Sequence, residues 1–114
     1  MVKRDLKLLQ GTLDVLVLKT LESGSHHGYA IAEWIRETTD ATLQIEDGAL
    51  YNSLHRMEKR RWLDSRWGVS ENNRRAKYYR LTAKGQRQLE QSTSAWNSYA
   101  EAVSKVLSST EGGR

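Results

Sequence analysis

The stretch GALYNSLHRMEKRRW, residues 48–62, decides the fold because it has the pattern of an amphipathic helix. Leu50, Leu54 and Met57 recur at i, i+4 and i+7, a spacing that places apolar side chains on one helical face. About 180° away the face is polar and basic, carries no acid, and consists of Asn52, His55, Arg56 and Lys59. The pattern predicts a helix from Gly48 to about Arg60 that is buried on one face and exposed on the other.

Two short segments after this helix have the alternation of half-buried β-strands. The inward positions of the first segment are Leu63, Ser65, Trp67 and Val69. The second segment alternates in the same way at Tyr79 and Leu81, and a polar tip at 70–75 separates the two. The pattern predicts a two-stranded hairpin. The cations at or near its tip are Arg74, Arg75 and Lys77.

The residues before the amphipathic helix predict two further helices. The run from Gln10 to Glu22 is apolar on most of its circumference, as expected of a core helix. Gly24 ends it, and we expect Ser25 to cap a second helix that starts at His26 or His27 and reaches Thr38. An extended connector should follow over 39–44, and Asp47 should be the N-cap of the helix at 48–60.

The C-terminal part predicts one long helix, with Thr82 as its N-cap and Gly85 as an internal weakness of about 1 kcal/mol relative to alanine. Two interleaved heptad series form a seam like that of a coiled coil: Leu89, Trp96 and Val103, and Ser92, Tyr99 and Val106. The seam can pack on the first helix of the same chain or on the same helix of a second chain. We expect both, in a two-fold homodimer.

These elements predict a mainly α fold with a small two-stranded β-wing (α+β), which is the pattern of a winged helix-turn-helix. Residues 1–81 would form that unit and residues 82–108 a C-terminal dimerisation helix. Residues 109–114 have no apolar anchor and are expected to form a flexible tail.

The positive charge is concentrated in one part of the sequence. The chain has a formal net charge of +4, but the segment 56–80 has nine Lys/Arg against three Asp/Glu, so it carries +6 and the remainder −2. A local basic surface suits a polyanion, because neutralised phosphates release condensed counterions. The alternative for a charge run is a solvated surface without a partner.

Several classes of function are disfavoured by composition. The chain has no cysteine, and His26, His27 and His55 lack a metal-ligand spacing, so we expect no metal and no cofactor. No cluster of nucleophile, base and acid and no phosphate-binding glycine loop predicts an enzyme. Without an apolar run of about eighteen residues or a signal-like start, we expect a cytoplasmic protein with no membrane partner.

The polar face of the helix at 48–60 is the first candidate for a DNA contact. Asn52 and Arg56 have side chains that can bind adenine and guanine edges bidentately. His55 and Lys59 would serve bases or phosphates. The wing cations Arg74, Arg75 and Lys77 would contact the backbone or the adjacent minor groove. The alternatives are an ordinary solvated helix face and charges that serve solubility.

Three further residues lie near helix starts. His27 and Tyr29 stand where backbone N–H groups and the helix dipole favour a phosphate, although His27 could equally be a plain cap. Tyr51 could reach a phosphate through its hydroxyl or pack its ring beside the second helix. Both alternatives stay open for His27 and Tyr51.

Four segments in this order and spacing resemble the PadR family of bacterial transcriptional regulators, over about residues 6–107. They are Gly11-Thr-Leu-Asp14 through Leu21, His27-Gly-Tyr29 with Ile31, Gly48-x-Leu-Tyr51 to Leu54 and Glu58, and Lys77-Tyr-Tyr-Arg-Leu-Thr82. The sequence departs from the family pattern at Asn52, where proline is common, and at Arg61, where glycine is common. Asn52 affects base preference, and Arg61 costs roughly 1 kcal/mol if a left-handed conformation is kept there.

The resemblance implies that the last helix forms a dimer and that a small aromatic effector binds near the dimer interface. The matching positions are Leu8, Leu9, Asp14, Val15 and Leu18 of the first helix with Leu89, Trp96, Tyr99, Val103 and Val106 of the last. For Trp96 and Tyr99 the alternative is plain packing in a dimer core.

The sequence as a whole predicts a sequence-specific, DNA-binding transcriptional regulator, a repressor that binds an inverted-repeat operator as a homodimer. Release by a small aromatic effector would complete the mechanism. In a bacterial cell the protein would associate with the nucleoid when bound to DNA. The alternative is a winged-helix protein-interaction module or a non-specific architectural DNA-binding protein.

Overall fold

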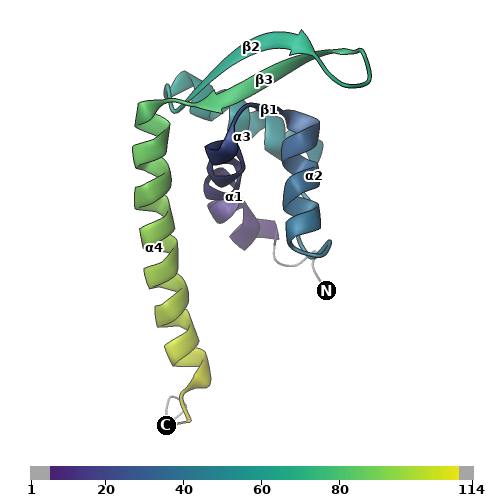
Figure 1. The fold of residues 1–114 in the computed structure, drawn as a ribbon. Coiled ribbons are helices and arrows are strands. Elements are labelled where there is room, and N and C mark those ends of the chain that lie inside the picture. Colours follow the sequence, from purple (N-terminus) through teal and green to yellow (C-terminus); the bar gives the residue numbers. More distant parts are fainter. Residues whose placement is uncertain (1–5, 111–114) are drawn as a thin grey trace.

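The computed structural model describes residues 6–110 (Figure 1), and side-chain surroundings from residue 12 onward. In chain order the elements are α1 (Leu6–Thr20), the 3-10 turn η2 (Leu21–Ser23), β1 (His26–His27), α2 (Gly28–Thr38), α3 (Asp47–Lys59), β2 (Leu63–Val69), β3 (Arg75–Leu81) and α4 (Ala83–Ser108). The predicted mainly α architecture with a β-wing is confirmed. The first helix begins at Leu6, four residues before the predicted start.

The sheet has three antiparallel strands in the order β1-β3-β2, where the sequence predicted two. The hairpin register pairs Leu63 with Leu81 and Val69 with Arg75, as the alternation required. The added strand β1 contains only His26 and His27, which pair with Tyr79 and Tyr78 of β3. A strand of two residues is too short to show alternation, so no sequence pattern indicates it.

One core joins the helices to the base of the sheet. Leu50, Leu54 and Met57 are fully buried, which confirms the predicted apolar face of α3. They pack with residues of α1, α2, the sheet and the start of α4: Leu13, Val17, Leu18, Leu21, Ile31, Ile35, Leu63, Tyr79 and Leu89. The hairpin lies across the top of the helices and its tip projects past α2 (Figure 1).

Three predicted local features are wrong. The N-cap of α2 is His27, not Ser25: the His27 Nδ1 atom accepts a hydrogen bond of 3.1 Å from the Ala30 amide. Residues 39–42 form a turn and a bend instead of the first part of an extended connector, because residues 40 and 41 both have positive φ. Glu46 occupies the N-cap position of α3, and Asp47 lies in the first turn, where a carboxylate favours the helix dipole.

The C-terminal end of α3 is a Schellman motif built on a non-glycine residue. The Trp62 amide donates to the Met57 carbonyl and the Arg61 amide to the Glu58 carbonyl. Arg61 has a φ of 63°, so the left-handed conformation is kept even though arginine replaces the glycine that would adopt it without strain.

The start of α4 is fixed against the turn that precedes the hairpin. The Thr82 hydroxyl accepts a hydrogen bond from the Gly85 amide at 3.0 Å, which confirms Thr82 as the N-cap. Gly85 is not merely a weak point of the helix. It is buried, and a Cβ atom there would lie 2.0 Å from the Trp62 carbonyl oxygen, so only glycine fits.

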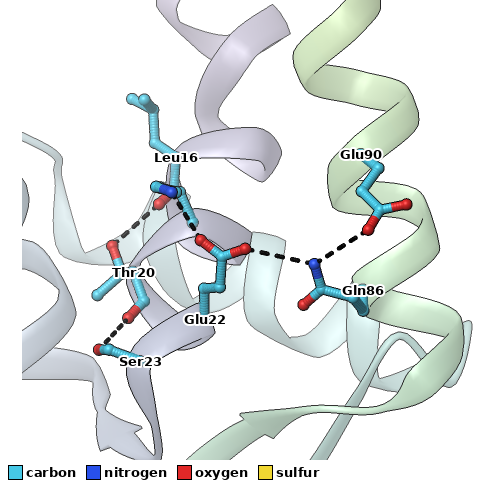
Figure 2. A network of polar contacts seen from close by, with 7 residues as sticks. Leu16, Thr20, Glu22, Ser23, Gln86 and Glu90 are labelled. Carbon is cyan, nitrogen blue, oxygen red and sulfur yellow. Dashed lines mark hydrogen bonds and ion pairs between the residues drawn. The ribbon is translucent and has the colours of Figure 1, made fainter.

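A polar network connects α1 to the first turns of α4 (Figure 2). The Glu22 carboxylate pairs with Lys19 at 2.6 Å and accepts a hydrogen bond from Gln86 at 3.3 Å. Gln86 also donates to Glu90 at 3.4 Å. The hydrogen bond from Lys19, followed by that from Gln86, lowers the pKa of Glu22. The network links the end of α1 to the first two turns of α4.

Beyond this network α4 runs alongside α1 and continues past it (Figure 1), which gives the molecule extents of 59 × 31 × 21 Å. Its 26 residues correspond to about 39 Å of helix. The predicted tail at 109–114 falls largely on residues 111–114, which lie outside the described residues.

Candidate nucleic-acid interface

The exposed residues of α3 include Asn52, His55 and Lys59. Their side chains have no hydrogen-bonding or charged partner within residues 12–110. Buried Leu50, Leu54 and Met57 hold the opposite face in the core. The three polar side chains are therefore presented to solvent by a helix whose orientation is fixed.

Arg56 lies on the flank of α3 that faces α1. Its Nη2 atom is 2.5 Å from the Asp14 Oδ1 atom, and the Ser53 hydroxyl donates to the same oxygen. This contact contradicts the assignment of Asp14 to a surface facing the last helix, because its carboxylate joins α1 to α3. It also distinguishes Arg56 from the other predicted base readers, since its guanidinium already has a carboxylate partner.

The start of α2 is tied to the hairpin through His27. Its Nδ1 atom caps the helix, and its Nε2 atom lies 3.8 Å from the Glu71 carboxylate at the hairpin tip. Its ring contacts Tyr78 edge-on, with centroids 5.2 Å apart. His27 therefore acts as a cap, one of the two alternatives left open, and its side chain is largely buried.

Tyr51 packs its ring against the first residue of α2. A Cβ atom on Gly28 would lie 2.4 Å from the Tyr51 hydroxyl oxygen, so the absence of a side chain at Gly28 makes room for the ring. Tyr51 remains 47% exposed, so the packing alternative holds while one side of the ring stays accessible. Tyr29, one residue into α2, is 71% exposed.

The three hairpin cations are held in different ways. Lys77 lies 3.4 Å from Glu58 of α3, whose carboxylate also accepts a 2.5 Å hydrogen bond from Ser65. The Arg75 guanidinium lies 4.5 Å from the centre of the Trp67 ring. Arg74 has no hydrogen-bonding or charged side-chain partner in the described part of the chain. Glu58 thus links α3 to both strands of the hairpin, and Arg74 is the hairpin cation whose side chain has no partner within the described residues.

The hairpin tip is a turn with a left-handed residue at its end. The Asn73 amide donates to the Ser70 carbonyl at 2.9 Å, and the Ser70 amide donates to the Arg74 carbonyl at 2.8 Å. Asn73 has a φ of 60°, a conformation that asparagine tolerates better than most residues. The turn projects Arg74 and Arg75 from the end of the hairpin.

A groove of about 1090 Å³ runs between the start of α2, Tyr51 and the side of the hairpin that faces the helices. Six of the predicted DNA-binding residues line it: His27, Tyr29, Tyr51, Arg74, Arg75 and Lys77. The other four, Asn52, His55, Arg56 and Lys59, do not line the groove and lie on α3. The predicted residues therefore form two neighbouring surfaces, an exposed helix face and a groove. The hairpin side of the groove carries three cations, and Glu33, Glu37 and Glu71 also line it.

Tyr79 forms part of the groove floor. It is a buried strand residue, and burial, followed by the charges of Glu58 and Tyr51, raises its pKa. The phenol therefore stays neutral at ordinary pH and adds no charge to the groove.

Sequence reasoning missed Gly28, Glu58 and Trp67 as parts of this region. Gly28 and Glu58 act through contacts with elements that are distant in sequence. Trp67 and Val69 were predicted to point inward, yet they are 56% and 65% exposed because the hairpin extends beyond the helical core. Alternation alone does not distinguish a strand face that covers a core from one that overhangs a groove.

A second groove, of about 720 Å³, lies between α1 and α4. Of the predicted effector or dimer positions, Val15, Leu89 and Trp96 line it. Leu18 is fully buried, which contradicts its assignment to an accessible surface. The side chains of Leu8 and Leu9 lie outside the described residues.

The remaining predicted positions continue along α4 as an exposed row. Tyr99, Val103 and Val106 are 55%, 36% and 72% exposed, and the rings of Trp96 and Tyr99 lie 5.9 Å apart. In the described part of the chain, no group of three or more His, Asp or Glu is arranged to hold a metal ion. None of the described helices is long and apolar enough to cross a membrane.

The sequence is similar to known transcriptional regulators. A family model described as the transcriptional regulator PadR-like family matches residues 17–91. The chain is 27% identical over 111 residues to an uncharacterised protein X of Lysinibacillus sphaericus, with 97% of this chain and 100% of that protein covered.

Solved structures agree in fold. A transcriptional regulator from Clostridium thermocellum is 30% identical with a TM-score of 0.79, covering 87% of this chain and 96% of that one. A PadR family transcriptional regulator from Eggerthella lenta is 31% identical with a TM-score of 0.78, covering 95% and 92%. A PadR family regulator from Clostridium difficile is 30% identical with a TM-score of 0.72, covering 84% and 98%.

Proposed function

The chain belongs to the PadR-like family of transcriptional regulators, and we propose that it binds double-stranded DNA through α3, the start of α2 and the β2–β3 hairpin. The observation that carries this proposal is the adjacency of the exposed α3 face and the hairpin cations that line the groove, Arg74, Arg75 and Lys77. A helix that enters the major groove places the neighbouring phosphate backbone between itself and the wing. The groove beside Tyr51 has the position and the cations for that backbone.

Within this surface we assign base contacts to the exposed face of α3. Asn52 can bind adenine bidentately, and His55 and Lys59 lie on the same face to reach bases or phosphates. Arg56 contributes to base recognition only if it leaves Asp14, and otherwise supports the helix from its flank. We therefore place Asn52 ahead of Arg56 as the base reader.

We assign phosphate contacts to the groove and the hairpin tip. Arg74 and Arg75 supply positive charge, and the Tyr51 hydroxyl and the exposed Tyr29 can donate to phosphate oxygens. Lys77 is paired with Glu58, so it adds less positive charge to the surface than the two arginines. His27 supports the surface by capping α2 and is not required as a ligand.

We further propose that the protein acts as a homodimer, with residues 1–81 reading DNA and residues 82–108 forming the dimer. The support is the row of exposed apolar side chains on α4: Trp96, Tyr99, Val103, Val106 and Leu107. Such a row on one projecting helix would be costly in water unless a second surface covered it. Two recognition helices about 34 Å apart would then match successive major grooves of an inverted repeat.

Regulation belongs to the same proposal. A repressor would bind its operator in the absence of ligand, and a small aromatic effector in the groove beside Trp96 would favour a dimer whose helices no longer match the half-site spacing. Titration with planar aromatic compounds, followed by tryptophan fluorescence, tests this part. The absence of any saturable change across a broad panel would contradict it. We place the protein in the bacterial cytoplasm, on the nucleoid when it is bound to DNA.

The deciding experiment is selection of duplex DNA from a random library at near-physiological salt, followed by sequencing. Enrichment of an inverted repeat would support a dimeric sequence reader and provide the operator. Salt-sensitive binding without enrichment would favour an architectural protein, because phosphate contacts alone are independent of sequence. No binding to DNA would favour the protein-interaction alternative. An Asn52→Ala variant should change the selected bases, and an Arg74→Ala variant should not.

A further inference from the structure

Trp67 is a large aromatic residue that the core does not use. It lies on β2 and shares a strand face with Leu63, which is buried, but it is itself 56% exposed because the hairpin overhangs the helices at this point. Its ring lines the groove beside Tyr51. Packing of the fold therefore gives no reason for tryptophan at this position.

The partner of Trp67 is Arg75. The guanidinium carbon lies 4.5 Å from the centre of the indole ring, within the range of a cation–π contact, and tryptophan is the best aromatic partner for it. The register places Trp67 opposite Lys77 and Val69 opposite Arg75, so Trp67 and Arg75 are diagonal neighbours on one face of the hairpin.

Arg75 differs from the other cations of β3 in the kind of partner it has. The other cations of β3 have carboxylate partners: Lys77 pairs with Glu58, and Arg80 with Asp64. No carboxylate pairs with Arg75 among the described residues. A guanidinium that lies over an aromatic ring has no carboxylate oxygen on its N–H donors, whereas an ion pair would occupy some of them.

We propose that Trp67 is a positioning residue of the DNA interface, which holds the Arg75 guanidinium over its ring at the groove so that the N–H donors are ready to bind a backbone phosphate. This inference rests on the proposed function. It adds a residue and a physical role: an arginine already held in its binding orientation loses less conformational freedom when the complex forms.

The test is a double-mutant cycle on DNA binding with Trp67→Leu, Arg75→Ala and the double variant. We expect Trp67→Leu to weaken binding about fivefold in the wild-type background and to have no effect in the Arg75→Ala background. Trp67→Tyr keeps a π face and should retain most of the affinity. Val69→Ala, which removes an aliphatic neighbour opposite Arg75 but no π face, serves as the matched control and should weaken binding less than Trp67→Leu.

A measurement on the free protein separates this inference from the proposed function. The indole ring current should shift the Arg75 side-chain protons upfield in NMR spectra, and Trp67→Leu should remove that shift without changing the unfolding midpoint. An equal loss from Trp67→Leu in both backgrounds, or no loss at all, would overturn the inference while wild-type DNA binding upheld the proposed function. Failure of the wild-type protein to bind any DNA would overturn both.

Discussion

Gly28 and Tyr51 occupy adjoining space: a Cβ atom at Gly28 would lie 2.4 Å from the Tyr51 hydroxyl oxygen and 2.6 Å from the ring carbon that bears it. The contact joins the start of α2 to the first turn of α3, two elements linked by the turn after α2. The ring of Tyr51 needs the space that a side chain at position 28 would fill, which explains the glycine there.

Gly28→Ala should displace the Tyr51 ring and leave the fold intact. The clash is with the far end of a side chain that is 47% exposed, so the ring can turn away at a cost of about 1 kcal/mol in unfolding free energy. Urea denaturation measures the cost, and the same variant should bind DNA less tightly. Gly48→Ala is the matched control, because a Cβ atom there meets nothing within 4 Å. Equal effects of the two changes on stability would contradict the contact.

Gly85→Ala should be far more damaging. The atom that a Cβ would meet is the Trp62 carbonyl oxygen, at 2.0 Å, and this oxygen also accepts hydrogen bonds from the Thr82 amide and hydroxyl. Backbone cannot turn aside as a side chain can, so we expect a loss of about 3 kcal/mol or more. Thermal unfolding followed by circular dichroism checks it. A loss no larger than that of Gly28→Ala would show that the start of α4 can shift freely.

Arg61→Gly should stabilise the protein. Arg61 holds the left-handed position of the Schellman motif with a φ of 63°, a conformation that costs a side-chain-bearing residue about 1–2 kcal/mol. Part of this gain is lost to the greater freedom of glycine in the unfolded chain, so the expected net gain is about 0.5–1 kcal/mol. Chemical denaturation gives the value, and destabilisation would mean that the arginine side chain makes a compensating contact.

The amphipathic helix α3 was predictable because its information is local. Leu50, Leu54 and Met57 repeat at helical spacing, and each is fully buried. The N-cap of α3 was not predictable from the sequence. Glu46 takes that position without a side-chain cap bond, while Asp47, a better capping residue by type, lies one residue further on. The register of the preceding turn decides such a choice, and positive φ at Asp40 and Ala41 gave no sequence signal.

The candidate site was predictable in composition but not in geometry. The sequence places Arg56 on the polar side of α3, yet its position depends on Asp14, 42 residues earlier. His27 was a candidate phosphate ligand or cap, and only the observed bond to the Ala30 amide distinguishes the two. Contacts between distant elements decide which side chains are free, and a periodicity along one element carries no information on them.

Asp14→Ala should destabilise the protein through Ser53. The Ser53 hydroxyl is buried and donates to the Asp14 carboxylate, so alanine leaves it without an acceptor at a cost of about 1–3 kcal/mol. Asp14→Asn keeps an acceptor oxygen and should cost less. Urea denaturation measures the unfolding free energy of both variants and of the double variant Asp14→Ala with Ser53→Ala. The comparison separates the cost of the unpaired Ser53 hydroxyl from the other losses. If the double variant were no more stable than Asp14→Ala, the hydroxyl would not be the source of the loss.

Arg74→Ala and Lys77→Ala should affect the salt dependence of DNA binding differently. Arg74 has no hydrogen-bonding or charged side-chain partner among residues 12–110, so its charge is available to a phosphate. Its removal should lower the slope of log K against log salt by about 1. Lys77 lies 3.4 Å from Glu58, which already offsets part of its charge. Its removal should change the slope less, although the remaining Glu58 carboxylate would repel phosphate and weaken binding at low salt. Fluorescence anisotropy over a series of salt concentrations measures both slopes.

Glu58→Gln in the Lys77→Ala background should recover part of the affinity, because it removes the unmatched negative charge. A slope reduced as much by Lys77→Ala as by Arg74→Ala would show that Lys77 leaves Glu58 to bind a phosphate directly.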